Sequence, residues 1–338
     1  MTLSEPGVES RKSSMRPLTR FAWLTLAYNI AGILWGAYVR ATGSGAGCGN
    51  RWPLCNGTVL PSTPQAQTII EFTHRLTSGL AILMVSSLLV WCWRKTSKGD
   101  WVRGSSVLAI LLLFNEALLG ALLVLFEHVG QDRSLARVFF LCMHFGNTLL
   151  LLAALALTAH WLSEGQRRLS VVKNRAEIAA VVLGLFATMC IGITGSLAAL
   201  GDTLFPATSL RTSLIDDFSS GNILLRLRFL HPVVAAIAAI YVIWLILRSL
   251  KRPGRLRNQE VMLAGVLIGQ IGLGILNVLF LAPLWLQLVH LLVAELFWVL
   301  VLLASANLLF DAADCNSAAR TARDSVATPS RSLRPDLL

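Results

Sequence analysis

Charged residues are scarce in this sequence. Only 14% of its 338 residues are Asp, Glu, Lys or Arg, against about 25% in an average soluble domain, and 55% are hydrophobic. This composition argues against a soluble globular domain and predicts an integral membrane protein. The first 19 residues also lack an apolar run, so we expect no cleavable signal peptide ahead of the first membrane span.

Eight segments are apolar and long enough to cross a bilayer, whose hydrocarbon core requires roughly 20 residues of helix. They are residues 21–39, 68–93, 104–126, 137–162, 176–200, 223–248, 259–282 and 284–310. We therefore expect an all-α integral membrane protein with eight transmembrane helices.

Lys and Arg are distributed unevenly among the segments that join these helices. Residues 1–20, 94–103 and 167–175 and the tail after 311 each hold four, and residues 248–257 hold five, whereas the alternate loops hold few. By the positive-inside rule, both termini are expected to be cytoplasmic. The net charge of +11 is then explained by contact with anionic membrane lipid, and no nucleic-acid partner is expected.

The first outer loop contains two cysteines, Cys48 and Cys55, in a glycine-rich segment. Two thiols in an oxidising compartment favour a disulfide, with metal ligation or free thiols as the alternatives. A structural zinc site would normally show two more Cys or His nearby, and the loop has none. The run TGSGAGCG at 42–49 is not followed by Lys-Ser or Lys-Thr, so a phosphate-binding loop is not expected.

The second half of the chain repeats the first. ThrGlySer at 42–44 returns at 194–196, and we place both copies where an odd-numbered helix ends on the outside; LGALLVL at 119–125 returns as LGILNVL at 273–279. This predicts two pseudo-symmetric four-helix bundles related by a parallel repeat. The expected domains are a cytoplasmic N-terminal segment (1–20), two bundles (21–162 and 163–310) and a cytoplasmic tail (311–338), with both terminal segments disordered.

Four histidines follow the same repeat. His74 corresponds to His231 and His144 to His290, and each lies about 10 Å below the outer surface at 1.5 Å per helical residue. Two neutral imidazoles per bundle, without a completing Cys or carboxylate, make a poor zinc site but commonly hold a b-type haem from both sides. We therefore expect two haem sites towards the outer face.

Glu71, His74 and Arg75 share one face of the second helix. Ionisable groups in a membrane span suggest a functional site, and the alternative is a Glu71–Arg75 ion pair beside a packed histidine. The residue three before His231 is Arg228. A carboxylate beside only one haem would place proton or oxygen chemistry there, while the other haem transfers electrons. Arg40 and Arg75 are candidate contacts for haem propionates.

The motifs GAYVRATGSGAGCGNRWPLCNG at 36–57 and EFTHRLTSG at 71–79, the later histidine-bearing helices and the duplicated layout resemble the haem A synthase family over roughly residues 20–310. The resemblance implies an oxidoreductase that converts the C8 methyl group of haem O to a formyl group, making haem A for cytochrome oxidase. Its implied substrate is haem O, and its implied cofactor is haem b.

The resemblance also implies roles for individual residues. Glu71 would be the catalytic carboxylate, and Cys48 and Cys55 match the family's first-loop pair, which is associated with a disulfide. The implied iron ligands are His74 and His144 for the substrate haem, and His231 and His290 for haem b. Residues 200–222 contain no Cys, so the chain departs from members that carry a second pair there.

Two other functions use similar residues. A dihaem b-type membrane electron-transfer protein, such as a quinol-linked cytochrome b, needs the four histidines but no carboxylate, and a haem transporter needs a more open site. Glu71 and the first-loop cysteines favour the enzyme. A haem O synthase and an unidentified electron acceptor are the expected partners, and homo-oligomers are left open. The short basic N-terminus lacks a mitochondrial presequence, which favours a bacterial plasma membrane.

Overall fold

The computed structural model describes residues 6–61, 65–164, 169–171, 174–212, 223–250 and 257–312. Eight long helices occur in this part of the chain, and each contains a stretch long and apolar enough to cross a membrane, so the expected count is confirmed. They are α1 (Pro6–Ala41), α2 (Ala66–Lys95), α3 (Trp101–Leu125), α4 (Leu135–Glu164), α5 (Arg175–Leu204), α7 (Ile223–Leu250), α8 (Arg257–Leu279) and α9 (Leu284–Leu309). The chain is a multi-pass membrane protein.

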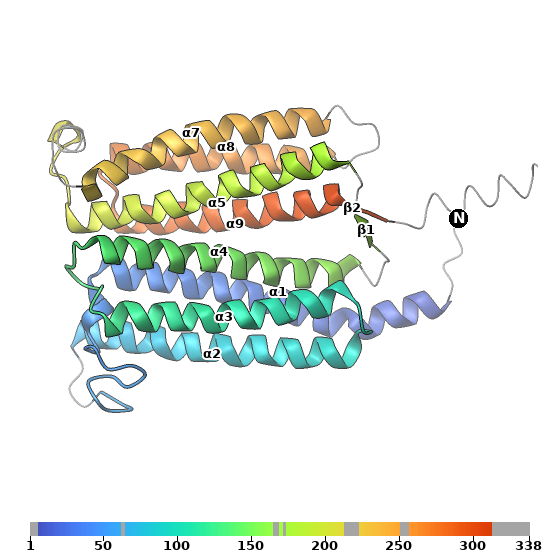
Figure 1. The fold of residues 1–338 in the computed structure, drawn as a ribbon, viewed down its shortest axis with the longest axis horizontal. Coiled ribbons are helices and arrows are strands. Elements are labelled where there is room, and N and C mark those ends of the chain that lie inside the picture. Colours follow the sequence, from blue (N-terminus) through green and yellow to red (C-terminus); the bar gives the residue numbers. More distant parts are fainter. Residues whose placement is uncertain are drawn as a thin grey trace, which may run out of the picture.

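The helices form two groups of four (Figure 1). α1 to α4 contact one another in the first group, and α5, α7, α8 and α9 form the second. α1 and α4 contact α5 and α9 where the groups meet. Trp298 of α9 donates from Nε1 to the carbonyl oxygen of Leu149 in α4, at 2.8 Å, so a buried hydrogen bond joins the two groups.

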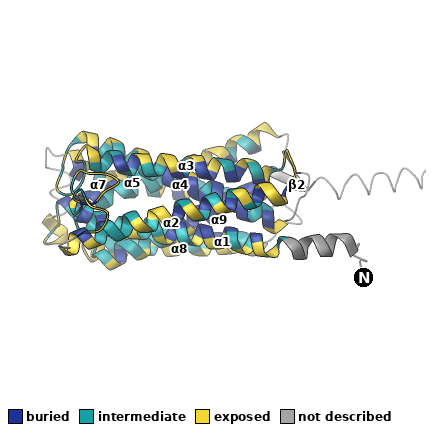
Figure 2. Ribbon diagram, turned by 90° about the horizontal axis from the view of Figure 1, so that it is seen from below, coloured by how far each residue is buried: buried dark blue, intermediate teal, exposed yellow. Residues whose placement is uncertain are grey.

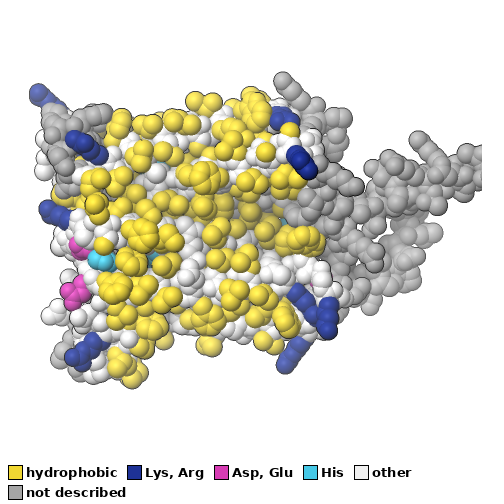
Figure 3. All heavy atoms as spheres, viewed as in Figure 1, with side chains coloured by type: hydrophobic (Ala, Val, Ile, Leu, Met, Phe, Trp, Pro, Cys, Tyr) yellow, Lys and Arg dark blue, Asp and Glu magenta, His cyan; other side chains and the backbone are white. Residues whose placement is uncertain are grey.

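Hydrophobic and charged side chains are distributed as expected for a bundle of transmembrane helices. Buried residues lie where helices face one another, and exposed ones lie outside (Figure 2). On the face drawn in Figure 3, hydrophobic side chains cover the middle and charged ones lie at the two ends. The first group and part of α9 share one core cluster, which includes Leu152, Leu155 and Leu302, while Val242 and Leu267 belong to a second cluster.

The N-terminal segment differs from expectation. We expected residues 1–20 to be disordered, but α1 already begins at Pro6. Further along the helix, Leu18 is buried, and Oγ1 of Thr19 donates to the carbonyl oxygen of Leu162 at 3.4 Å. The polar residues before the apolar span therefore continue its helix, which hydropathy alone does not show.

Two short strands were not expected. β1 (Leu169–Val171) pairs antiparallel with β2 (Phe310–Ala312), with Leu169 opposite Ala312. The pair joins the connection after α4 to the end of α9. The rest of the tail that we expected to be disordered, residues 313–338, lies outside the described residues.

The two ends of the bundle differ. We call the end that carries residues 42–61 the disulfide end, and the end that carries β1 and β2 the strand end (Figure 1). α2, α4, α7 and α9 run from the disulfide end to the strand end. A 3-10 turn, η1 (Ser44–Ala46), follows α1 at the disulfide end.

One expected feature of the repeat is wrong. We placed both ThrGlySer copies at helix ends, but only the first follows its helix, whereas residues 194–196 lie inside α5, which continues to Leu204. Gly43 has a positive φ of 67° after α1, while Gly195 is helical. The shared tripeptide therefore occupies two different structural positions.

A prediction concerns the seam between the groups. A Cβ built on Gly192 of α5 would lie 2.8 Å from Cδ1 of Leu149 and 3.2 Å from Cε1 of Phe145, both in α4. We expect Gly192→Val to lower the free energy of unfolding by about 1–3 kcal/mol through overpacking, measured by thermal unfolding in detergent. Gly265→Val is the control because Gly265 is a helical glycine with nothing within 4 Å of the same position. Equal effects would contradict a tight seam.

Candidate functional site

The four expected histidines lie near the start of four helices that all begin at the disulfide end. His74 is in α2, His144 in α4, His231 in α7 and His290 in α9. In the second group the expected partners lie close together, because the rings of His231 and His290 have centroids 6.5 Å apart with planes at 80°. His74 and His144 lie on α2 and α4 of the first group.

Each histidine faces a glycine on a neighbouring helix, and this was not foreseen. A Cβ built on the glycine would lie between 3.1 and 3.6 Å from Cε1 of the imidazole in all four cases. The pairs are Gly36 with His74, Gly120 with His144, Gly195 with His231 and Gly274 with His290. The imidazoles therefore occupy space that a side chain would otherwise fill.

These contacts give the correct alignment of the two halves. Gly120 and Gly274 belong to the LeuGly repeat that the sequence displays, but Gly36 matches Gly195, and not the glycine of the first ThrGlySer. The sequence shows glycines in the second half of α1, α3, α5 and α8. The sequence alone does not show which of these glycines faces which imidazole ring.

The donor set fits a haem group better than a tetrahedral metal. Nδ1 of His74, His144 and His290 is buried without a hydrogen-bond partner, and Nδ1 of His231 lies 3.3 Å from Oγ1 of Thr194. Within the described ranges, no group of three or more His, Cys, Asp or Glu could hold a metal ion. A b-type haem iron is commonly ligated by two imidazoles, one on each side, without further protein ligands.

Glu71 is buried, with 3% of its surface exposed, and both of its carboxylate oxygens have partners. Oε2 accepts the backbone N–H of Cys48 at 2.7 Å. Oε1 accepts Nη2 and Nε of Arg75 at 2.5 and 3.1 Å. The ion pair that we considered as the alternative to a catalytic role is therefore present.

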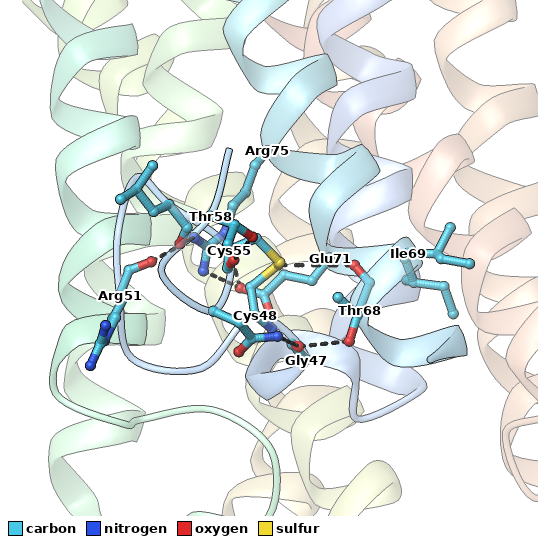
Figure 4. The surroundings of a disulfide bond; sticks show 12 residues. Gly47, Cys48, Arg51, Cys55, Thr58, Thr68, Ile69, Glu71 and Arg75 are labelled. Carbon is cyan, nitrogen blue, oxygen red and sulfur yellow. Dashed lines mark hydrogen bonds and ion pairs between the residues drawn. A yellow bond between two sulfur atoms is a disulfide. The ribbon is translucent and has the colours of Figure 1, made fainter. Parts of the chain in front are cut away.

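Arg75 also holds the disulfide loop. Its Nη1 donates to the carbonyl oxygens of Arg51 at 3.0 Å and Leu54 at 2.8 Å. Figure 4 shows Glu71 and Arg75 reaching from α2 into the loop that carries the Cys48–Cys55 disulfide. The expected bridge is confirmed, and one carboxylate and one guanidinium fix the loop above the start of α2.

Arg40, the other expected propionate contact, lies at the seam between the two groups. Its Nη1 donates to Oγ1 of Thr203 in α5 at 3.0 Å, and its charge interacts with those of Asp202 and Arg137. Its contact with a propionate stays a prediction. So does that of Arg75, whose donors already reach Glu71 and the loop carbonyls.

The other two histidines of the chain, His128 and His160, lie outside the paired set. Nδ1 of His128 is 2.9 Å from Oδ2 of Asp132, and Nε2 of His160 is 3.0 Å from Oδ1 of Asn307 near the strand end. Burial opposes ionisation of Asp132, but hydrogen bonds from Ser134 and His128 outweigh it and hold the pKa of this carboxyl below its usual range. This network orders the loop between α3 and α4.

Glu116 was missed by sequence reasoning. It lies in α3, and its Oε1 is 3.3 Å from Nδ1 of His144. In the second group, Nε2 of Gln270 in α8 lies 3.4 Å from Nε2 of His290. A carboxylate inside a span was the available signal, but the sequence does not show which histidine on another helix it would reach.

Comparison with known proteins identifies the family. The sequence matches the COX15-CtaA family model, described as cytochrome oxidase assembly protein, over residues 19–302. The chain belongs to this family. The four histidines, residues 42–61 and the starts of α2, α4, α7 and α9 all fall within the matched region.

Individual relatives carry two different names. A protein of Thermus thermophilus, named protoheme IX farnesyltransferase, is 44% identical over 295 residues, which cover 86% of this chain and 48% of that protein. Heme A synthase of Halalkalibacterium halodurans is 40% identical over 142 residues, covering 42% of this chain and 45% of that protein. Heme A synthase of an Exiguobacterium species is 27% identical, with 68% and 72% covered. The chain spans about half of the length of the Thermus relative.

A prediction tests how the disulfide loop is held. A Cβ built on Gly47 would lie 2.5 Å from the backbone carbonyl carbon and oxygen of Gln67 in α2, and the Gly47 carbonyl accepts Oγ1 of Thr68 at 2.8 Å. Since backbone must move to admit a methyl group, we expect Gly47→Ala to loosen the loop and speed cleavage by an added protease. Gly32→Ala, where nothing lies within 4 Å, is the control. Unchanged cleavage in Gly47→Ala would contradict a close fit.

Proposed function

We propose that this protein is a haem A synthase, an oxidoreductase that converts the C8 methyl group of haem O to a formyl group. The observation that carries the proposal is the contrast between two similar histidine pairs. Each pair faces across one four-helix group, but Glu71 and Glu116 accompany only the first. Two haem sites that differ at the positions of Glu71 and Glu116 suit a reaction at one haem and electron transfer at the other.

The residues divide between the two sites as follows. His231 and His290 would hold a resident haem b, and His74 and His144 would hold the iron of haem O. When bound, the haem groups supply the redox chemistry. The protein's own contribution at the first site is orientation by two facing imidazoles and a loop closed by the Cys48–Cys55 disulfide.

Glu71 is the proposed catalytic carboxylate. Its oxygens are oriented by the N–H of Cys48 and by Arg75, so the group is held in place before substrate binds. It would accept a proton at a carboxylate oxygen as the methyl carbon is oxidised, or orient water beside that carbon. General acid–base catalysis of this kind typically contributes about 10²–10⁴-fold to a rate.

The setting of the reaction follows from the charge distribution and the relatives. In the sequence, Lys and Arg are concentrated before the first span, between α2 and α3, between α4 and α5, between α7 and α8, and after α9, whereas residues 42–61 hold only Arg51. We therefore propose that the disulfide end faces outward from a bacterial plasma membrane and that both termini are cytoplasmic. The Thermus relative is named for farnesyl transfer to protoheme and is about twice as long as the matched region. We propose that a haem O synthase is the partner that supplies the substrate.

A dihaem electron carrier is the alternative. It would use all four histidines and leave Glu71 as a structural ion-pair partner. The carboxylates beside the histidines of the first group favour the enzyme.

The catalytic assignment predicts the behaviour of Glu71→Gln. The amide keeps an acceptor for the Cys48 N–H but loses the charge, so we expect haem to stay bound while haem A formation falls by about 100-fold or more. The assay is chromatography of extracted haems after expression with a haem O synthase. Glu127→Gln is the control, because Glu127 is an exposed carboxylate at the same end that accepts from Asn50. Full activity in Glu71→Gln would reject the assignment.

The assignment of the two sites predicts a second result. We expect His231→Ala or His290→Ala to remove the low-spin b-type spectrum of the protein purified without haem O. His160→Ala should keep that spectrum, because His160 lies near the strand end beside Asn307. A normal spectrum in His231→Ala together with its loss in His74→Ala would show that the two sites are exchanged.

A further inference from the structure

We propose that Glu116 is a positioning residue for His144. Its carboxylate receives the Nδ1–H of the imidazole and so sets the orientation and donor strength of one iron ligand at the first haem site. Gln270 occupies the corresponding place in the second group and gives His290 an uncharged partner. The inference rests on the proposed function, because it assigns a role at the site where haem O would bind.

The Glu116 carboxylate is held in place by the helix that carries His144. Oε2 accepts Nδ2 of Asn147 at 2.6 Å, and Oε1 accepts the hydroxyl of Thr148. Asn147 in turn donates to the carbonyl oxygen of Leu112 at 2.9 Å and accepts Nδ2 of Asn115 at 2.8 Å. A carboxylate in a membrane span is costly unless it is partnered in this way, and the partners leave Oε1 directed at the neighbouring imidazole.

His144 lacks the hydrogen bond that this carboxylate can supply. Its Nδ1 is buried without a hydrogen-bond partner in the described structure, although Oε1 of Glu116 lies 3.3 Å away within ion-pair distance. A small rotation of the ring or the carboxylate would complete the bond. An iron-ligating histidine normally donates its other ring N–H to a carboxylate or carbonyl, which fixes the ring and raises its basicity as a ligand.

The repeat places a carboxylate in one group and an amide at the equivalent position in the other. Glu116 lies four residues before Gly120, which faces His144, and Gln270 lies four residues before Gly274, which faces His290. The two side chains therefore occupy equivalent places on α3 and α8. Nε2 of Gln270 lies 3.4 Å from Nε2 of His290 and 3.2 Å from its carbonyl oxygen. At equivalent places in the two groups, a neutral amide thus lies near Nε2 of one imidazole and a carboxylate lies near Nδ1 of the other.

A purely structural role is the competing explanation. Glu116 also joins α3 to α4 through Asn147 and Thr148, and that function would persist without any effect on a bound haem. The two explanations differ in what they predict for the iron. A carboxylate on the ligand's N–H makes the imidazole a stronger donor and stabilises oxidised iron, whereas a helix-joining contact leaves the reduction potential unchanged.

The experiment compares Glu116→Gln with the reciprocal Gln270→Glu in the protein of residues 1–338. Each is purified with resident haem, loaded with haem O, and titrated optically to obtain the reduction potential of each haem. We expect Glu116→Gln to shift the potential of the haem O site upward and leave the other unchanged. Gln270→Glu should shift the resident haem downward. Gln259→Glu, on α8 beside Asn307, is the control for an added charge on the same helix.

The outcomes separate this inference from the proposed function. If His144→Ala leaves the haem O spectrum of the loaded protein unchanged, haem O does not bind there, and the proposed function and this inference both fail. If His144→Ala alters that spectrum but Glu116→Gln shifts no potential, this inference alone is overturned. If Glu116→Gln does not accumulate, Gln270→Glu decides: a downward shift absent from Gln259→Glu supports the role of the position, and no shift rejects it.

Discussion

The facing of two imidazoles across each four-helix group is the constraint on which the rest of this structure depends. A polar ring in a membrane span has few partners, and here each imidazole lies against a glycine of the preceding transmembrane helix. The glycine has no side chain, so the two helices can approach closely and the imidazole still has room between them. Helix lengths, the alternation of direction and the duplication together bring all four rings near the disulfide end.

The two groups share this frame but differ in the charge around it. In the first group, Glu71 fixes the disulfide loop through Cys48 and Arg75, and Glu116 lies beside His144. In the second group, Gln270 stands where Glu116 would be, and Arg228 pairs with Asp202 at 3.3 Å. Duplication followed by a change of charge would be a simple way to obtain the two proposed haem sites with different chemistry from one packing arrangement.

Much of the fold and part of the site follow from sequence, because hydropathy and helical period are local properties. The eight spans were predicted from hydropathy, the pairing of the histidines from the repeat, and the Cys48–Cys55 bridge from two cysteines in an outer loop. Contacts between helices were not. Glu116 was overlooked because its partner His144 is on another helix. The start of α1 at Pro6 was overlooked because the residues before its apolar span are polar.

The repeat illustrates the same limit. ThrGlySer was the most visible match between the halves, yet the structure aligns Gly36 with Gly195 by their contacts with His74 and His231. Matching residues in the sequence indicated the duplication, but only the contacts between helices showed which residues of the two halves are equivalent. The alignment of Glu116 with Gln270 emerged from that register and from the LeuGly repeat.

The central claim is that one of two haem sites oxidises haem O, and the most direct measurement is the identity of the haems that the protein contains. The chain would be expressed with a haem O synthase and purified in detergent, and its haems extracted and identified by chromatography and mass. The account predicts haem A, or its hydroxylated precursor, beside haem B. Haem B alone, at two per chain and with haem O available, would contradict it and identify a dihaem electron carrier.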